Sequence, residues 1–397
     1  MRFAKGTMTI TAPEYIRQLN PYVPGKPIEE TKREFGLKKV IKLASNENPL
    51  GPSPKARLAL AKVTKELHRY PDGAAFHLKN ALAKHEKIAP SNLVIGNGSN
   101  EIIDMLIRTF CVAGDSIVTS KGAFIAYKIC AQIQGVRSVE TEMGSDLRFD
   151  LGSMLEQVKR DPKAKIVFLA NPNNPTGTYV RGDELRKFIA EVSKVRGGSV
   201  LVVLDSAYCE YVTAKDLPNP TTVFGEFPET VVVLKTFSKV YGLAGLRVGY
   251  AIGSPSILSN LEKVRMPFNL NSLALVAAEA ALKDQAFVKR AVKANSDGMK
   301  FWEKGLKQLG IPFWPSQGNF ILANVAEGLG KPGGEVYQSC LRRGVIFRPV
   351  ANYGLLHALR ISIGTAAENK IALAALAQEK KTSGAALSAA KTKRGRA

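Results

Sequence analysis

Apolar residues in this chain gather into short continuous runs that alternate with longer amphipathic stretches. Five runs rich in valine, isoleucine and leucine cover Ser116–Thr119, Lys165–Ala170, Ser199–Leu204, Thr230–Leu234 and Arg247–Gly253. Because these runs are continuous rather than alternating, we expect strands that are covered on both faces. Between them, apolar residues spaced three and four positions apart predict helices, for example over Gly182–Arg196 and Ser256–Arg265.

This alternation predicts an α/β fold with a mostly parallel sheet sandwiched by helices. After about residue 284 the pattern changes to a long amphipathic helix (Phe287–Leu309) and short strands, which predict a smaller α+β domain. The residues before about 45 are expected to form an arm that packs on this domain or reaches a partner subunit. The expected division is an N-terminal arm (1–45), a large domain (46–283), a small C-terminal domain (284–379) and a basic, disordered tail (380–397).

The net charge of +22 over 397 residues raises the question of nucleic-acid binding. Six of the cations lie in the last 18 residues, and the remaining sequence has no basic helix or zinc-finger spacing. A basic chain also suits an enzyme that handles phosphorylated, anionic small molecules. We therefore expect small-molecule partners and no nucleic-acid partner.

Several other classes of protein are disfavoured by the sequence. No run approaches the roughly 18 uncharged apolar residues of a membrane span, so no membrane association is expected. The first residues contain no apolar signal segment, and the four cysteines form no CxxC pair, which favours the reducing cytoplasm. The four histidines have no metal-ligand spacing, so no metal site is expected.

Polar clusters follow several of the apolar runs. They are Asn171–Gly177, Asp205–Tyr208, Lys235–Lys239 with Arg247 eight residues later, and Gly96–Glu101, which opens a predicted helix. Taken alone, each cluster is an ordinary turn or helix start. However, the carboxyl ends of parallel strands meet at one edge of a sheet, and ligands bind there.

Together, these clusters supply the groups that a pyridoxal 5'-phosphate site requires. A buried lysine such as Lys239 can act as a nucleophile once its pKa is lowered. Asp205 can keep the pyridine nitrogen protonated, and Tyr208 and Asn174 can donate hydrogen bonds to the phenolate oxygen. Arg247 and the backbone N–H groups of the helix start can bind the phosphate.

The segment Thr236-Phe-Ser-Lys-Val-Tyr-Gly-Leu-Ala-Gly-Leu-Arg247-Val-Gly-Tyr250 resembles the cofactor attachment segment of the fold-type I, class II aminotransferases. The resemblance extends from about residue 20 to residue 375. Within the class, the chain is most similar to the histidinol-phosphate aminotransferase subfamily. The segments that carry this similarity are Tyr22–Glu30, Lys42–Pro54, Arg69–Asp72 and Leu359–Thr365.

The resemblance implies the pyridoxal-phosphate fold type I and a role for each matching residue. Lys239 would carry the cofactor and move the substrate proton, and Asp205 would pair with the pyridine nitrogen. Phe124 would stack on the ring. The residues implied at the cofactor's O3' are Tyr208 and Asn174. Those implied at its phosphate are Ser99, Asn100, Thr236, Ser238 and Arg247.

The resemblance also implies a homodimer, because Tyr70 would reach the phosphate of the neighbouring subunit's cofactor. On the substrate side, Arg360 would hold the carboxylate of glutamate and Arg348 would help to bind the substrate's phosphate. Tyr22 and Asn48 are further expected substrate contacts. The chain departs from the family's usual residues at three positions, which are Asn100, Ser206 and Gly122.

The implied reaction is transamination of L-histidinol phosphate with 2-oxoglutarate, a step in histidine biosynthesis. Two other activities of the same fold remain open, those of an aromatic-amino-acid aminotransferase and of a threonine-phosphate decarboxylase. From another class, a nucleic-acid-binding protein that uses the basic tail is the remaining alternative.

Overall fold

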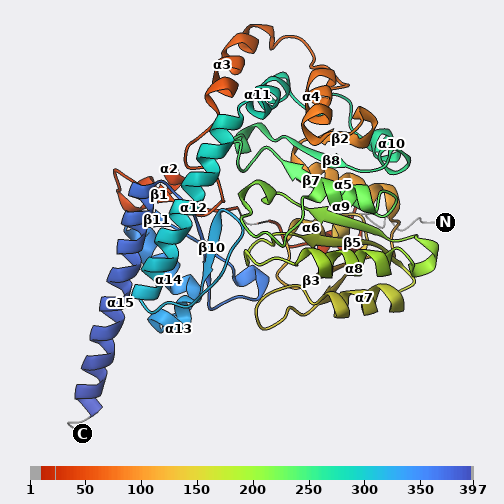
Figure 1. Cartoon of the computed structure of the whole chain (residues 1–397). Helices are drawn as coiled ribbons and strands as arrows, with labels where there is room; N and C mark the ends of the chain where they lie inside the picture. Colours follow the sequence, from red (N-terminus) through yellow and green to blue (C-terminus); the bar gives the residue numbers. More distant parts are fainter. Residues whose placement is uncertain (1–9, 23, 395–397) are drawn as a thin grey trace, which may run out of the picture.

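A seven-stranded sheet forms the centre of the larger part of the molecule (Figure 1). The computed structural model describes residues 10–22 and 24–394. The strand order is β2-β8-β7-β6-β5-β3-β4, and only β8 runs antiparallel to its neighbours. The strands are β2 (Leu93–Gly96), β3 (Ser116–Ser120), β4 (Arg137–Thr141), β5 (Ala164–Ala170), β6 (Leu201–Asp205), β7 (Val231–Thr236) and β8 (Gly249–Ile252).

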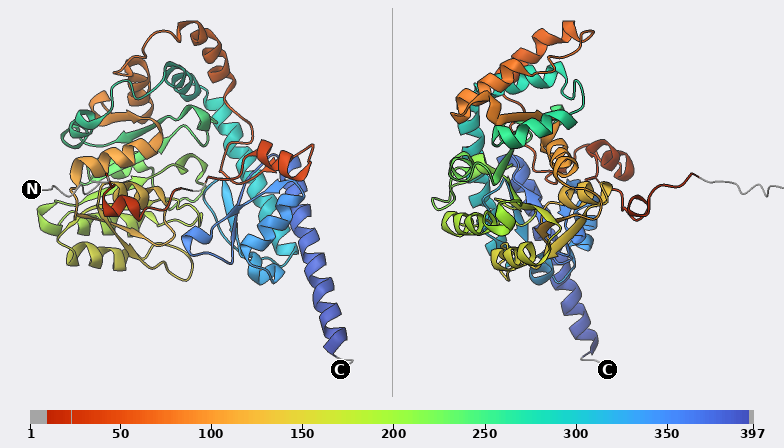
Figure 2. Two further views of the ribbon diagram at one scale, coloured as in Figure 1. Left: turned by 180° about the vertical axis from the view of Figure 1, so that it is seen from behind. Right: turned by 90° about the vertical axis from the view of Figure 1, so that its right-hand side faces the viewer.

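Helices pack on both sides of this sheet, which confirms the predicted α/β class (Figures 1 and 2). They include α5 (Gly98–Phe110), α6 (Ala126–Ile133), α7 (Leu151–Arg160), α8 (Gly182–Val192), α9 (Pro220–Glu226) and α10 (Pro255–Val264). Every residue of β6 and β7 is buried, which explains why these strands appear in the sequence as continuous apolar runs. The edge strand β4 is polar and half-buried, and the hydrophobic pattern did not predict it.

A second helical layer lies beyond the β2–β8 edge of the sheet. It contains α3 (Pro54–Val63), α4 (Phe76–Glu86) and α11 (Ser272–Leu282), and α11 packs against the other two. The alanine- and leucine-rich α11 buries six of its residues, as expected for a core helix.

The smaller part is built on a four-stranded antiparallel sheet in the order β12-β13-β10-β9. Its strands are β9 (Phe313–Trp314), β10 (Phe320–Ala323), β12 (Arg348–Pro349) and β13 (Leu359–Ser362). Its helices are α12 (Gln285–Gln308), α13 (Val325–Leu329), α14 (Gly333–Arg342) and α15 (Ala366–Arg394). This α+β arrangement agrees with the predicted character of the region, and the exact domain limits stay predictions.

The N-terminal arm joins the two parts of the molecule. Its first helix α1 (Glu14–Arg17) contacts α6, and α2 (Ile28–Phe35) follows. Strand β1 (Ile41–Lys42) then pairs in parallel with β11 (Val345–Ile346), whereas the next strand β12 belongs to the four-stranded sheet. Ile41 and Leu43 belong to the core of the smaller part.

The C-terminal segment differs from the expected disordered tail. Helix α15 continues through residue 394 and extends away from the body of the molecule (Figure 2). Residues 395–397, the end of the predicted tail, lie outside the described residues. Within residues 10–22 and 24–394, no helix is long and apolar enough to cross a membrane, and no group of three or more metal-ligating side chains gathers.

Candidate active site

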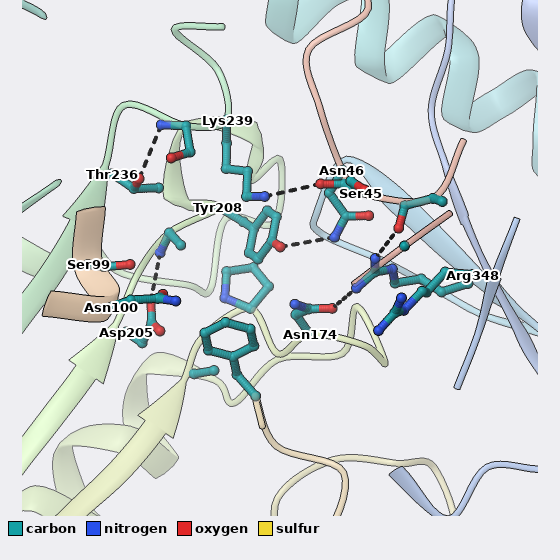
Figure 3. Close-up of a pocket in the computed structure, with 18 of the residues that line it drawn as sticks. Ser45, Asn46, Ser99, Asn100, Asn174, Asp205, Tyr208, Thr236, Lys239 and Arg348 are labelled. Carbon is teal, nitrogen blue, oxygen red and sulfur yellow. Dashed lines mark hydrogen bonds between the residues drawn. The ribbon is translucent and has the colours of Figure 1, made fainter. Parts of the chain in front are cut away.

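A cavity lies where the carboxyl ends of β5, β6 and β7 face the smaller sheet and the N-terminal arm (Figure 3). Thirteen of the fifteen predicted site residues line it. These are Tyr22, Ser99, Asn100, Phe124, Asn174, Asp205, Tyr208, Thr236, Ser238, Lys239, Arg247, Arg348 and Arg360. The polar clusters that follow separate strands in the sequence therefore converge on one cavity, as parallel sheet topology requires.

Lys239 lies in the turn after β7, and its Nζ donates a hydrogen bond to the Ser45 carbonyl at 3.3 Å (Figure 3). Burial lowers its pKa to about 8, and the nearby Arg360 and Arg247 guanidinium groups contribute to this shift. A substantial fraction of this amine is therefore unprotonated near neutral pH, which is the form required of a nucleophile or a general base.

Asp205, the last residue of β6, is buried and also lines the cavity with its carboxylate. Its Oδ2 accepts a hydrogen bond from the Tyr127 hydroxyl at 2.7 Å, and its Oδ1 accepts one from the Ala207 N–H at 3.2 Å. Burial raises its pKa, while these two neutral donors and Lys239 oppose that shift. Such a carboxylate gains strongly from a cationic ligand atom.

Two side chains that line the cavity, Tyr208 and Asn174, keep a hydrogen-bond donor available. The Tyr208 hydroxyl accepts a bond from Asn46 Nδ2 at 3.0 Å, so its own hydrogen remains available (Figure 3). Asn174 uses its Oδ1 to accept from Arg360 Nη1, which leaves its amide nitrogen as a donor. Burial raises the pKa of Tyr208 to about 12, so this phenol stays protonated at neutral pH.

The N-terminus of α5 and Arg247 form an anion-binding cradle. Arg247 Nη1 lies 3.2 Å from Ser238 Oγ, and its guanidinium packs directly over Gly98. A Cβ at Gly98 would lie 2.5 Å from Arg247 Nη2, and the φ of +75° also favours glycine there. The dipole and free N–H groups at the start of this 13-residue helix add to the positive potential around Ser99 and Asn100.

The smaller sheet contributes two arginines from paired positions of neighbouring strands. Arg348 on β12 is in register with Arg360 on β13. Arg360 is buried, its Nη2 donates to the Ala44 carbonyl at 2.5 Å, and its buried Nε has no protein partner among the described residues. The Arg348 guanidinium lies 6.0 Å from the centre of the Tyr22 ring at the side of the cavity. Together they give this side of the cavity two guanidinium groups, the side-chain type best suited to bind carboxylates and phosphates.

Two predicted site residues do not line the cavity. Asn48 donates to the Val240 carbonyl at 2.8 Å and accepts from the Leu50 N–H at 2.9 Å, so its side chain serves a local turn. Tyr70 is 82% exposed and stacks on Phe268 at a centroid distance of 4.7 Å. In one chain it therefore contacts solvent rather than this site.

Among the contacts that were not predicted, two side chains form hydrogen bonds to site residues from outside the predicted set. Tyr127 lies on α6 and bonds Asp205, and Asn46 bonds Tyr208 while its own Oδ1 accepts from Ser362 Oγ at 2.9 Å. Asn46 lies within the Lys42–Pro54 segment that carries the family resemblance, and this was the available indication. Nothing in the local sequence distinguishes Tyr127 from an ordinary core residue of an amphipathic helix.

The donor set fits pyridoxal 5'-phosphate. A lysine of lowered pKa, a carboxylate, two hydrogen-bond donors and Arg247 beside the start of α5 line one cavity. The backbones of β8 and of the start of α5 also lie close together, since a Cβ at Gly249 would lie 2.4 Å from the Ser99 backbone nitrogen. This close packing beside Arg247 also fits a site for the cofactor.

Comparison with known proteins gives consistent matches over almost the whole chain. The family described as aminotransferase class I and II matches residues 38–376. The chain is 45% identical over 364 residues to a histidinol-phosphate aminotransferase of Anaeromyxobacter sp. (strain Fw109-5), covering 92% of this chain and 97% of that protein. It is also 45% identical over 375 residues to histidinol-phosphate aminotransferase 2 of Methylococcus capsulatus, covering 93% and 98%.

Solved structures agree with these sequence matches. The histidinol-phosphate aminotransferase of Sinorhizobium meliloti, determined in complex with pyridoxal-5'-phosphate, matches with a TM-score of 0.84 at 29% identity. That match covers 96% of this chain and 99% of the other.

Proposed function

The chain belongs to the class I and II aminotransferase family, and from that premise we propose that it transfers the amino group of L-histidinol phosphate to 2-oxoglutarate. It is a pyridoxal-phosphate-dependent aminotransferase with the fold of that family. The proposal places it in histidine biosynthesis, in keeping with the names of its relatives. The observation that best supports this proposal is the pair of arginines, Arg348 and Arg360, which lines the same cavity as Lys239.

The proposed cofactor contacts follow from the geometry of the cavity. Pyridoxal 5'-phosphate supplies a carbonyl that binds amines and a ring that withdraws electrons from the substrate carbon. Lys239 would attach the cofactor, and Asp205 would pair with the ring nitrogen. Arg247 and the start of α5, with Thr236 and Ser238, would bind the phosphate. Phe124 would stack on the ring, and Tyr208 and Asn174 would donate to the phenolate oxygen. All of these residues line the cavity.

Lys239 also acts on the substrate in this proposal. Once the substrate amine has taken its place, Lys239 Nζ would be free to accept the proton from the Cα of the amino donor, and in the second half-reaction it would deliver a proton to the Cα of the new amino acid. The pKa of about 8 suits this task, because a general base is most effective when its pKa lies near the working pH.

Arg360 and Arg348 select the substrate. Both substrates carry an anionic group at the end remote from the amine or keto group, a phosphate in one and a carboxylate in the other. A guanidinium with a free, buried Nε gains a strong charge-assisted hydrogen bond when either anion enters. Tyr22 lies beside Arg348 and closes the cavity from the arm side.

The proposal includes a homodimer in which Tyr70 completes the neighbouring subunit's site. Tyr70 and Phe268 form an exposed aromatic pair, and Leu67 and Met266 beside them are also exposed. An exposed apolar patch of this kind favours a protein contact. A cytoplasmic location is also proposed, in keeping with four free cysteines.

Mixing two variants tests the shared site. Lys239→Ala and Tyr70→Ala are each expected to be weakly active as pure proteins. In a mixed dimer, one site combines an intact Lys239 with an intact Tyr70 from the other chain, so mixing should restore activity. If unfolding and refolding the two variants together restores nothing, the shared-site dimer is wrong.

An absorbance titration tests the substrate. The purified protein should show the visible band of the bound cofactor, and L-histidinol phosphate should bleach it at far lower concentration than L-phenylalanine. Arg348→Ala should weaken the response to histidinol phosphate much more than the response to phenylalanine. The reverse substrate preference would instead support an aromatic-amino-acid aminotransferase, and the absence of a band after adding pyridoxal phosphate would contradict the catalytic proposal.

A further inference from the structure

Tyr127 is a fully buried residue whose hydroxyl contacts the Asp205 carboxylate. Its hydroxyl donates to Asp205 Oδ2 at 2.7 Å. Its ring stacks on Phe168 at a centroid distance of 4.6 Å and meets the edge of Phe124 at 5.7 Å. The ring is therefore held on two sides, and the hydroxyl has a fixed position relative to the carboxylate.

In this contact Tyr127 is the donor and the carboxylate is the acceptor, so the contact affects the charge of Asp205. Tyr127 is a phenol whose pKa burial and Asp205 both raise, so it remains a donor to the carboxylate. The other titratable groups that face Asp205 are Tyr208 and Lys239. The second direct hydrogen-bond donor to Asp205 is the Ala207 backbone N–H. Tyr127 is thus the only side chain that the described residues bring into hydrogen-bond contact with this carboxylate.

We propose that Tyr127 is a positioning residue that orients the Asp205 carboxylate and keeps it ionised, so that a pyridine nitrogen facing it stays protonated. This inference rests on the proposed function. A hydrogen bond to the ionised form of a carboxylate favours that form over the protonated one. Without the hydroxyl, the proton shared between Asp205 and the ring nitrogen moves toward the carboxylate. The pyridine then withdraws electrons less strongly and is bound less tightly.

The chain offers a matched control outside the site. The Tyr250 hydroxyl is also fully buried and donates to the Glu86 carboxylate, at 2.6 Å. Glu86, however, is ion-paired with Lys235 at 2.7 Å. Tyr127→Phe and Tyr250→Phe therefore delete the same group from the same kind of contact, and only the first contact belongs to the site.

The first arm of the experiment uses the holoenzyme. Tyr127→Phe should raise the dissociation constant for pyridoxal phosphate about tenfold, as expected for losing a hydrogen bond to a charged group. It should lower kcat and leave KM for the amino donor nearly unchanged, because Tyr127 does not reach the substrate side of the cavity. Tyr250→Phe should change neither quantity.

The second arm uses the full chain freed of cofactor and measures thermal unfolding against pH. Burial places the pKa of Asp205 above its usual value, and Tyr127→Phe should raise it further. The stability difference between wild type and Tyr127→Phe should then be small in acid. It should grow as the pH rises through the Asp205 pKa, and it should lose this pH dependence in an Asp205→Asn background.

A pH-independent loss of stability, or the same loss in the Asp205→Asn background, would reduce Tyr127 to a structural residue and overturn the proposal. Unchanged cofactor affinity in Tyr127→Phe would overturn it as well. A protein that binds no pyridoxal phosphate but keeps the pH-dependent coupling contradicts the proposed function and supports the Tyr127–Asp205 coupling. The two failures are therefore distinguishable.

Discussion

Two lysines four residues apart have opposite electrostatic surroundings. Lys235 at the end of β7 is ion-paired with Glu86 at 2.7 Å and lies 3.6 Å from Glu210. Burial disfavours its charge, but Cys209, Tyr250 and the two carboxylates raise its pKa well above the usual value. Lys239 faces two arginines instead, and its pKa falls to about 8. Lys235 therefore stays charged, whereas Lys239 can gain or lose its proton.

The carboxylates nearby show the same contrast. Burial would raise the pKa of Glu86, but Lys235, Thr221 and Tyr250 outweigh it and leave the pKa below its usual value. Asp205 has only neutral hydrogen-bond donors, and burial leaves its pKa raised. The Glu86 carboxylate is thus ion-paired with a cation of its own cluster, whereas no cation forms a hydrogen bond or ion pair with Asp205 among the described residues. An uncompensated buried charge lowers stability until a ligand of opposite charge binds.

The largest effect is expected from Lys239→Ala. Loss of the nucleophile and the general base together should lower kcat by about four orders of magnitude or more, since general-base catalysis alone contributes roughly 10²–10⁴-fold. Single-turnover kinetics with L-histidinol phosphate measure this directly. Activity near the wild-type level would show that the amine is not required, and thermal unfolding checks that the variant is folded.

Lys235→Met tests the other lysine. It leaves Glu86 buried without its cation, and breaking a buried ion pair in this way costs about 3–5 kcal/mol of unfolding free energy. Activity per folded molecule should be retained, because Lys235 does not line the cavity. Chemical denaturation measures the first expectation and titrated active-site concentration the second. Equal losses of activity in the two lysine variants would contradict the contrast between them.

The sequence predicted the parts of the fold and site that depend on local pattern. Strands buried on both faces appear as continuous apolar runs, and polar residues at their ends gave Lys239, Asp205 and Arg247 as site residues. The edge strand β4 has no such pattern. The pairing of β1 with β11 joins segments about 300 residues apart, and no local sequence pattern predicts such a contact.

What the sequence could not give depends on long-range packing. Tyr127 reaches Asp205 only because α6 packs beside the β6 end, 78 positions away in the chain. Asn48 was expected on the substrate side, but its amide is used by the turn at Leu50. The proposed role of Tyr70 depends on a second copy of the chain. Charge balance around Lys235 and Lys239 likewise comes from residues far away in sequence.

The pH dependence of stability in the cofactor-free chain gives an intermediate effect. The folded pKa of Lys239, about 8, lies below the 10.5 of an ordinary lysine, so its contribution to stability increases as the pH rises between these values. At about 1.4 kcal/mol per pKa unit, the difference of about 2.5 between these two pKa values gives a gain of at most about 3.5 kcal/mol. Lys239→Met should lack this increase. A wild-type curve that follows the Lys239→Met curve from about pH 8 to pH 10 would contradict the lowered pKa.

The smallest effect is expected from Thr221→Val. The Thr221 hydroxyl donates to Glu86 Oε2 at 2.6 Å, and its loss should cost about 1 kcal/mol because Lys235 and Tyr250 still hold the carboxylate. The folded pKa of Glu86 lies below the unfolded value of 4.5, so Glu86 stabilises the fold above that pH. The cost of Thr221→Val should therefore be constant from about pH 6 to pH 8 and shrink as the pH falls below about 4.

Thermal unfolding of Thr221→Val beside Tyr127→Phe turns this into a direct comparison of the two carboxylates. Both variants remove a neutral hydrogen-bond donor from a buried carboxylate. A difference in how their stability losses depend on pH therefore comes from the cation that Glu86 has and Asp205 lacks. The Thr221→Val profile should be flat where the Tyr127→Phe profile is still changing. A carboxylate whose folded pKa lies below its usual value is fully ionised above pH 5, so the cost of losing a donor to it no longer changes with pH there. Two parallel profiles would therefore mean that the charge of Asp205 is stabilised as well as that of Glu86.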